Sequence, residues 1–298
     1  MTRHFIVALL AVVSHTLWSQ SFYAIRKERS LILNAGTGMA TYLGEMQNPG
    51  KVFDDRLNVT AGLQLFITPR IAARTDLTWF QLQGDDRDAN SDRVERNLSF
   101  RSGNIELSAT GAIYLFNNGK RFYQRPSYNI YAFAGVGTTY INPKTLYQGD
   151  WVPLQPLQTE GVSYSRFQPV IPYGLGLVLK PHPFYNIVIE GGLRKTFTDY
   201  LDDVSIRRYP DPATLSSPLA VALSDRRRER DPDYPISPNV GVRGNPENDD
   251  SYFLLNVKVQ YYLPVYLSNS NAAQKRLYNK KRKAFYRYNK GGGLKRRR

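Results

Sequence analysis

The feature that most constrains this chain is a set of segments of about ten residues in which apolar and polar side chains alternate. In residues 253–263 the odd positions are apolar, whereas Asn256, Lys258 and Gln260 occupy even positions. A β-strand places successive side chains on opposite faces. The pattern therefore predicts strands with one apolar and one polar face.

The same alternation occurs eight times along the chain. Each segment is close to the roughly 9 to 11 residues that a tilted strand needs to cross a bilayer. An even number of strands is typical of bacterial outer-membrane barrels. The segments are residues 31–39, 57–67, 71–79, 105–116, 130–140, 171–179, 185–197 and 253–263.

The connections between these segments alternate in length. Short ones, at 68–70, 117–126 and 180–184, follow the second, fourth and sixth segments, and long ones follow the others. Outer-membrane barrels have short periplasmic turns and long extracellular loops, whereas a soluble sandwich has no reason to sort its loops this way. The chain is therefore predicted to be all-β: an eight-stranded antiparallel transmembrane β-barrel with long extracellular loops and both termini in the periplasm.

The polar faces of the strands would line the barrel interior and carry charges of both signs. An eight-stranded barrel is just wide enough for side chains to fill it. We expect these charges to pair and pack the lumen, which disfavours a water-filled pore, while the apolar faces contact outer-membrane lipid. The predicted lumen residues are Arg74, Asp76, Glu106, Glu190, Arg194 and Lys258.

Residues 1–20 have the layout of a secretory signal peptide, with Arg3 before an apolar run at 5–13 and small polar residues around Ser19. We expect the barrel to occupy 21–267. The chain has no cysteine, which excludes disulfides, thiol catalysis and thiolate metal sites. His182, the one histidine beyond the expected signal peptide, falls in a predicted periplasmic turn, far from the acids discussed next.

The stretch "RKTFTDYLDDVSIRRY" at 194–209 gathers Asp199, Asp202 and Asp203. Residues 197–199 are predicted to end the seventh strand, and 200–205 to begin its long loop at the outer rim. The two adjacent acids, Asp202 and Asp203, could pair with Arg207 and Arg208, bind a calcium ion, or act as paired catalytic carboxylates. The segment lacks the alternate acids and central glycine of a calcium loop, and we favour a structural rim with no metal or cofactor.

Residues 268–298 form a tail rich in lysine and arginine that contains no acidic residue. An exported protein meets little nucleic acid, so the expected partners are anionic headgroups, peptidoglycan or acidic periplasmic proteins. A disordered, solvated tail is the alternative. The predicted partner-binding residues are Lys275, Arg276, Lys280, Lys281, Arg282, Lys283 and Arg287.

Several segments of the chain resemble the PorG family, outer-membrane barrels of Bacteroidota associated with the type IX secretion system. The resemblance covers roughly residues 30–263, and the basic tail departs from it. It is carried by "TYLGEMQ" (41–47), "RNLSFRSGNIELS" (96–108), "AGVGTTYINP" (134–143), "PLQTEG" (156–161), "IPYGLGL" (171–177), "RKTFTDYLDDVS" (194–205) and "RGNPENDDSYF" (243–253). The most specific residues are Phe197, Thr198, Asp199, Tyr200, Leu201, Asp202 and Asp203.

This resemblance implies a component of the secretion and gliding machinery that contacts the periplasmic PorK and PorN ring proteins. The sequence thus favours a non-enzymatic anchor or assembly factor. The alternatives are a barrel enzyme that acts at the cell surface through the acids of 199–203, and an adhesin-like protein or small-solute channel.

Overall fold

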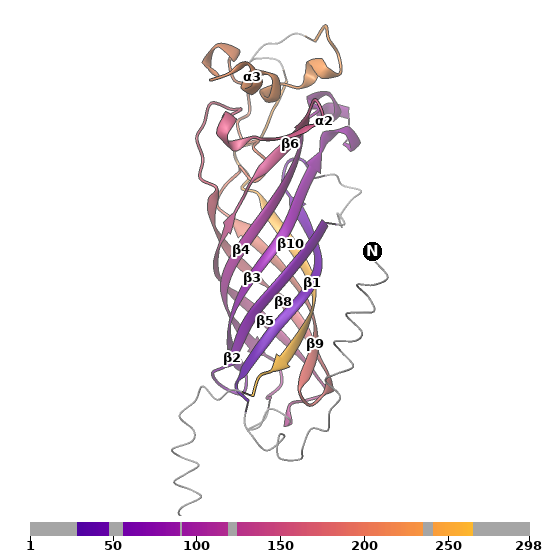
Figure 1. Ribbon diagram of the computed structural model, residues 1–298, viewed down its shortest axis with the longest axis vertical. Helices are drawn as coiled ribbons and strands as arrows, with labels where there is room; N and C mark the ends of the chain where they lie inside the picture. Colours follow the sequence, from indigo (N-terminus) through magenta and orange to yellow (C-terminus); the bar gives the residue numbers. More distant parts are fainter. Residues whose placement is uncertain (1–28, 48–55, 90, 119–123, 235–240, 265–298) are drawn as a thin grey trace, which may run out of the picture.

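The computed structural model describes residues 29–47, 56–89, 91–118, 124–234 and 241–264. The expected signal peptide and the basic tail, with all of its predicted partner-binding residues, lie outside these ranges. Within them the chain forms one closed barrel whose strands tilt across the long axis of the molecule (Figure 1).

The barrel wall is an antiparallel sheet in which each strand pairs with its neighbours along the chain. Pairing of β1 (Leu31–Leu43) with β10 (Ser251–Tyr262) joins the first wall strand to the last, and pairing of β3 (Ile71–Asp85) with β4 (Ser99–Tyr114) completes the circle. This confirms the predicted eight-stranded antiparallel barrel. The wall strands are β1 (Leu31–Leu43), β2 (Arg56–Phe66), β3 (Ile71–Asp85), β4 (Ser99–Tyr114), β5 (Tyr128–Tyr140), β8 (Phe167–His182), β9 (Tyr185–Thr196) and β10 (Ser251–Tyr262).

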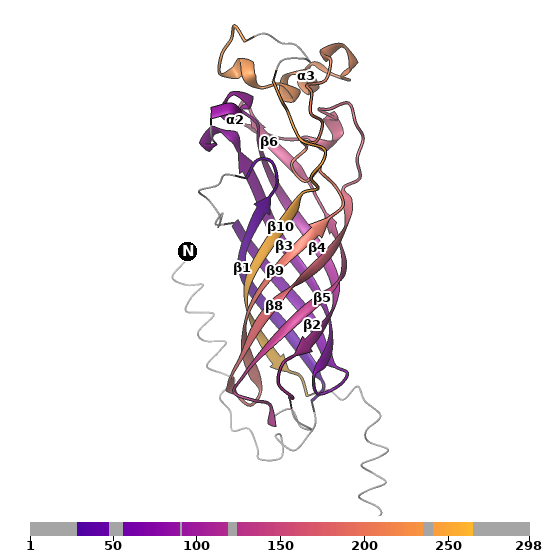
Figure 2. The same ribbon diagram turned by 180° about the vertical axis from the view of Figure 1, so that it is seen from behind.

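The loops differ strongly between the two ends of the barrel. At the short-turn end, β2–β3 and β8–β9 are joined by tight turns, in one of which Ile67 N donates to Ile71 O at 2.9 Å. The opposite, long-loop end carries the other ordered elements, which both views place together (Figures 1 and 2). These are α2 (Ser91–Arg96), the hairpin of β6 (Pro143–Tyr147) and β7 (Asp150–Pro153), α3 (Pro218–Ser224), and 3-10 turns at Asp86–Asp88, Gln155–Leu157, Pro212–Thr214 and Arg227–Glu229.

Side chains alternate between the outside and the inside along every wall strand. On the outside, Leu77, Val136 and Leu175 are 54%, 66% and 63% exposed, and they belong to a continuous apolar belt. Side chains between them are buried and mostly polar, such as Asn34 and Asn256. An apolar exterior around a polar interior is what a lipid solvent requires. Among the described residues, no helix is long and apolar enough to cross a membrane.

Several strands extend further at the long-loop end than the sequence pattern predicts. β3 and β4 stay paired as far as Asp85 and Ser99, although the predicted segments end at 79 and begin at 105. Gln81, Gln83 and Arg101 occupy outward positions there, so the apolar alternation stops while the backbone pairing continues. The wall therefore projects beyond the apolar belt.

Glycines make room for lumen side chains, as at Gly36 and Gly176. A Cβ at Gly36 in β1 would lie 2.8 Å from Lys258 Cγ on β10. A Cβ at Gly176 in β8 would overlap the ring of Tyr131 on β5. At both positions the absence of a side chain lets a large partner reach the centre of the barrel.

We expect Gly176→Ala to lower the free energy of unfolding by about 1–3 kcal/mol, because the added methyl group displaces the Tyr131 ring from a filled interior. Urea unfolding of the barrel in lipid vesicles measures this change. Gly111→Ala, at an outward position where a Cβ meets only Ala134 O at 4.0 Å, is the control and should leave stability nearly unchanged. Equal effects of the two substitutions would contradict this account of the interior.

Candidate functional site

The interior contains two polar assemblies, one in the lumen and one in the mouth at the long-loop end. All six predicted lumen residues point inward, and none of them is more than 5% exposed. The structure divides them into a lumen quartet (Arg74, Asp76, Glu190 and Lys258) and an upper pair (Glu106 and Arg194).

The lumen quartet combines two cations with two carboxylates. Arg74 forms a buried ion pair with Glu190, and its Nε lies 2.8 Å from Asp76 Oδ2. Lys258 Nζ lies 2.7 Å from Glu190 Oε1 and 3.5 Å from Asp76 Oδ2. Removing one partner of a buried ion pair costs about 3–5 kcal/mol because it leaves an uncompensated charge. The quartet is therefore a mutually dependent unit.

Aromatic side chains hold the lumen charges in place. Tyr131 donates its hydroxyl proton to Glu190, and its ring stacks on Tyr114 at 4.9 Å between centroids. In the upper pair, Arg194 Nε lies 3.4 Å from Glu106 Oε2, and the Tyr252 hydroxyl donates to the same oxygen at 2.7 Å. Paired and stacked side chains thus fill the interior both at the lumen quartet and at the upper pair.

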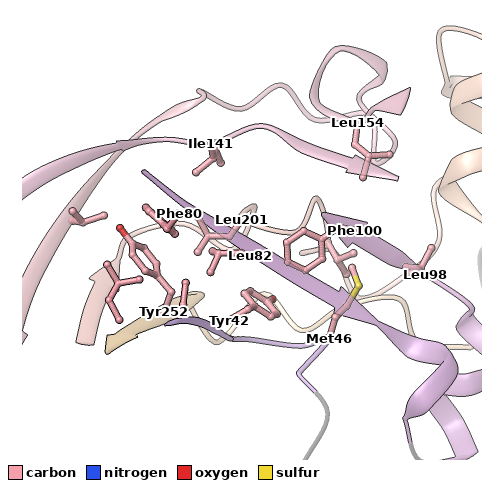
Figure 3. Packing of buried hydrophobic residues seen from close by; sticks show 14 of the residues in the cluster. Tyr42, Met46, Phe80, Leu82, Leu98, Phe100, Ile141, Leu154, Leu201 and Tyr252 are labelled. Carbon is pink, nitrogen blue, oxygen red and sulfur yellow. The ribbon is translucent and has the colours of Figure 1, made fainter. Parts of the chain in front are cut away.

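The loop after β9 enters the barrel mouth. Residues 201–205, here called the mouth plug, are all buried, and Leu201 lies among Phe80, Leu82 and Tyr252 of the wall (Figure 3). The prediction that 197–199 complete the seventh strand is wrong, since β9 ends at Thr196. The prediction that 200–205 lie at the outer rim is also wrong for the plug, because its apolar residues Leu201 and Val204 add to the core of the mouth.

Asp202 shares a hydroxyl with a second acid from the far end of the same loop. Tyr42 Oη lies 2.7 Å from Asp202 Oδ2 and 2.7 Å from Asp250 Oδ1. A tyrosine hydroxyl has one proton to donate, so the close approach of both carboxyls requires one of them to be protonated. Burial, reinforced by the neighbouring carboxylate, raises the pKa of Asp202, and burial raises that of Asp250 to about 7.

Asp203 and Glu160 tie the plug to the loop between β5 and β8. Asp203 accepts hydrogen bonds from Thr159 Oγ1 and from the Tyr164 hydroxyl, the latter at 2.6 Å. Burial raises the pKa of Asp203 to about 6, although Arg243 opposes the rise. Glu160 forms a buried ion pair with Arg243 and accepts from Ser205 N at 3.0 Å. Loops far apart in sequence are thereby fastened together.

The remaining residues of the fingerprint segment 197–203 have different surroundings. Phe197 is 55% exposed on the outside of the barrel, and Thr198 O accepts from Asp250 N at 3.0 Å. Tyr200 stacks on Tyr164 with 4.7 Å between centroids. Burial, with repulsion from Asp250, raises the pKa of Asp199 to about 8. From Thr198 onward the segment is thus built into the mouth, whereas Phe197 stays on the outside.

The predicted pairing of Asp202 and Asp203 with Arg207 and Arg208 is wrong, because the two arginines are exposed whereas both acids are buried and bonded to other groups. In the described part of the chain, no group of three or more histidine and acidic side chains is arranged to hold a metal ion.

Sequence reasoning from Asp202 and Asp203 alone missed most of their partners. The network, here called the mouth network, joins strand β1 to loops that are distant in sequence. No local alternation or motif links these partners, because they come from separate segments of the chain. The mouth network consists of Tyr42, Thr159, Glu160, Tyr164, Asp202, Asp203, Arg243 and Asp250.

No protein-family model and no curated protein matches the chain. Among solved structures it is similar to neisserial surface protein A, with 9% identity over 78% of this chain and 97% of that one and a TM-score of 0.39. It is also similar to Ail of Yersinia pestis (10% identity, 78% and 98% covered, TM-score 0.39). A major outer membrane protein of Thermus thermophilus shares 14% identity over 78% and 98%, with a TM-score of 0.38. At these identities the likeness is one of fold alone.

Tyr42→Phe removes the hydroxyl that Asp202 and Asp250 share. We expect it to weaken the attachment of the mouth plug by about 1–3 kcal/mol, since buried carboxyls lose their donor. Limited proteolysis within 206–249 should accelerate while the β-sheet signal in circular dichroism stays constant. The control is Tyr173→Phe on the lipid-facing side of β8, and equal cleavage rates in both variants would contradict the role of Tyr42.

The plug should loosen as pH rises. The pKa values of Asp250 (about 7) and Asp199 (about 8) exceed the ordinary aspartate value of about 4. The folded plug therefore binds more protons than the released one, and its stability falls as pH rises from about 4 to about 8. Proteolysis of the loop across this range measures the effect. Asp199→Asn should flatten the profile, whereas Asp211→Asn, at an exposed acid of the same loop, should not; a profile flat in the parent protein would refute this prediction.

Proposed function

We propose that this outer-membrane β-barrel is a non-enzymatic, non-conducting anchor that helps to assemble the periplasmic ring of a type IX secretion and gliding apparatus. The observation that carries the architectural part is the filled interior. The lumen quartet and the upper pair cross the barrel at two levels, and the mouth plug fills its long-loop end. Such an interior disfavours passage of solutes and favours a rigid support.

The acids of the mouth also favour support over catalysis. Asp202 and Asp203 are 0% and 2% exposed, and their oxygens accept hydrogen bonds from Tyr42, Tyr164 and the chain itself. A catalytic acid needs access to its substrate. The segments that resemble the PorG family supply these buried contacts, so the resemblance concerns the construction of the barrel as well as its expected partners.

The proposal also includes the orientation of the barrel, with its short-turn end facing the periplasm. Long loops face the exterior in outer-membrane barrels, which assigns the short-turn end to the periplasm. Leu263 N donates to Leu31 O at 2.9 Å at that end, so the chain leaves the barrel there on its way to the basic tail. The tail would then meet acidic surfaces of PorK-like and PorN-like ring proteins, without any nucleic-acid partner.

Truncation after Leu267 tests this proposal. We expect the shortened protein to fold and to reach the outer membrane at normal abundance, because the described barrel ends before the tail. In a mild-detergent pulldown from the native membrane, the full chain should bring PorK-like and PorN-like proteins with it, and the truncated chain should lose them.

A tail in which Lys275, Arg276, Lys280, Lys281, Arg282, Lys283 and Arg287 are replaced by glutamine separates charge from length. The matched control is a tail with the parent composition in scrambled order. It should still bring down the ring proteins, because the proposed attraction depends on net charge. Undiminished recovery of the ring proteins with the truncated barrel would refute the role of the tail.

A further inference from the structure

A pair of cations stands on the outer surface of the barrel just beyond the apolar belt. Arg101 on β4 and Lys144 on β6 are register partners, and both point away from the interior. The Arg101 guanidinium lies 5.6 Å from the centre of the Trp151 ring on β7. The β6–β7 hairpin is therefore a lateral extension of the wall that brings a second cation and an aromatic ring beside Arg101.

The position of Arg101 along β4 determines how far this pair of cations lies from the edge of the apolar belt. Ile105 and Trp79 are the last outward apolar residues of β4 and β3, and they are register partners. Arg101 lies four residues beyond Ile105. With about 3.3 Å per residue and a strand tilt of about 40°, its Cα is about 10 Å above the edge of the belt. A long arginine or lysine side chain at that height reaches the headgroup layer of the membrane.

The surface between the cations and the belt is hollow. A cleft of about 270 Å³ is lined by Arg101, Gly103, Asn142, Lys144 and Trp151. A Cβ added at Gly103 would meet no atom within 4 Å, so the space below Arg101 is open. The cleft offers two cationic groups, an amide and an indole face to a ligand that arrives from the side of the membrane.

Both cations lack an acidic partner in the part of the chain that the structure describes. Within the described residues, no carboxylate forms an ion pair with Arg101 or Lys144, and Arg101 Nη2 donates to the neutral amide oxygen of Gln81 at 3.0 Å. Two other outward cations do have acidic partners: Lys195 Nζ lies 2.9 Å from Asp249 Oδ2, and Arg87 Nη2 lies 2.6 Å from Asp85 Oδ2. The positive charge on this face is therefore open to an anion from outside the chain.

We propose that Arg101, Lys144 and Trp151 form a binding site for the phosphate-bearing headgroup of an anionic glycolipid in the outer leaflet. A guanidinium binds phosphate through two parallel N–H donors, an ammonium adds a point charge, and a tryptophan is favoured where apolar chains meet headgroups. The acyl chains of such a lipid would lie along the belt below, beside Ile105 and Leu107. This inference rests on the proposed function in one respect only, namely that the long-loop end of the barrel faces the cell exterior.

The test uses the full chain in lipid nanodiscs made of phosphatidylcholine with a minor share of bisphosphorylated lipid A. Native mass spectrometry after release into detergent counts the lipid A retained by each barrel. We expect the parent protein to retain lipid A in preference to phosphatidylcholine. Arg101→Gln with Lys144→Gln should reduce that retention about thirtyfold, given about 1 kcal/mol per cation near an anionic surface.

The matched control removes two outward cations that already have partners, by Arg87→Gln and Lys195→Gln, and it should retain lipid A as the parent does. Dephosphorylated lipid A, in place of the bisphosphorylated form, should be retained no better than phosphatidylcholine. Inorganic phosphate added during release should compete weakly, since it lacks the acyl chains. Circular dichroism verifies that each variant is folded.

Equal retention of lipid A by the Arg101 and Lys144 variant and by the parent would overturn the site. So would equal retention of phosphorylated and dephosphorylated lipid. Full displacement by inorganic phosphate would identify a free anion as the ligand and overturn the assignment to a lipid. Because the nanodiscs contain no ring proteins and expose both ends of the barrel, none of these outcomes depends on the proposed role in secretion.

Discussion

The closure of the sheet is the constraint on which the rest of this structure depends. In hydrocarbon, every backbone N–H and C=O group needs a partner within the protein, and pairing of β3 with β4 leaves no open edge in the barrel wall. Eight strands enclose a space only wide enough for side chains. Charged residues on the inner faces therefore meet one another, and the lumen quartet results because two cations and two carboxylates neutralise each other there.

The sequence predicted the strand segments of the closed barrel wall, where side chains must alternate between lipid and lumen. Alternation is strict where one face meets lipid and the other the lumen, so the segments ending at Trp79 and beginning at Ile105 were located correctly. Beyond them the outward residues Gln81, Gln83 and Arg101 lie above the apolar belt, and the same paired backbone no longer carries an apolar signal. The extra length of β3 and β4 was missed for this reason.

The mouth network was beyond the reach of local patterns. Tyr42 and Asp250 are 208 residues apart, and Tyr42 and Asp202 are 160 apart, yet one hydroxyl contacts both acids. Consecutive acids such as Asp202 and Asp203 usually indicate an exposed loop, because burying a carboxylate without partners is costly. Here the partners come from three distant segments, so no local pattern indicates that they meet.

The two ends of the interior differ in how their charges are balanced. The lumen quartet matches acids with bases, so its attraction offsets the cost of burial. In the mouth, Asp199, Asp202 and Asp250 outnumber nearby cations, and they stay buried by keeping protons, as the raised pKa values of Asp199 and Asp250 show. The hydrogen bonds of Tyr42 with Asp202 and Asp250 therefore involve neutral groups and are screened little by salt, whereas Glu160 and Arg243 contribute an ion pair to the same network. On the outer wall the imbalance is reversed, since among the described residues neither Arg101 nor Lys144 forms an ion pair with an acid. A water-facing site could leave that charge to small ions, but at this height above the belt the nearest source of anions is the headgroup layer itself.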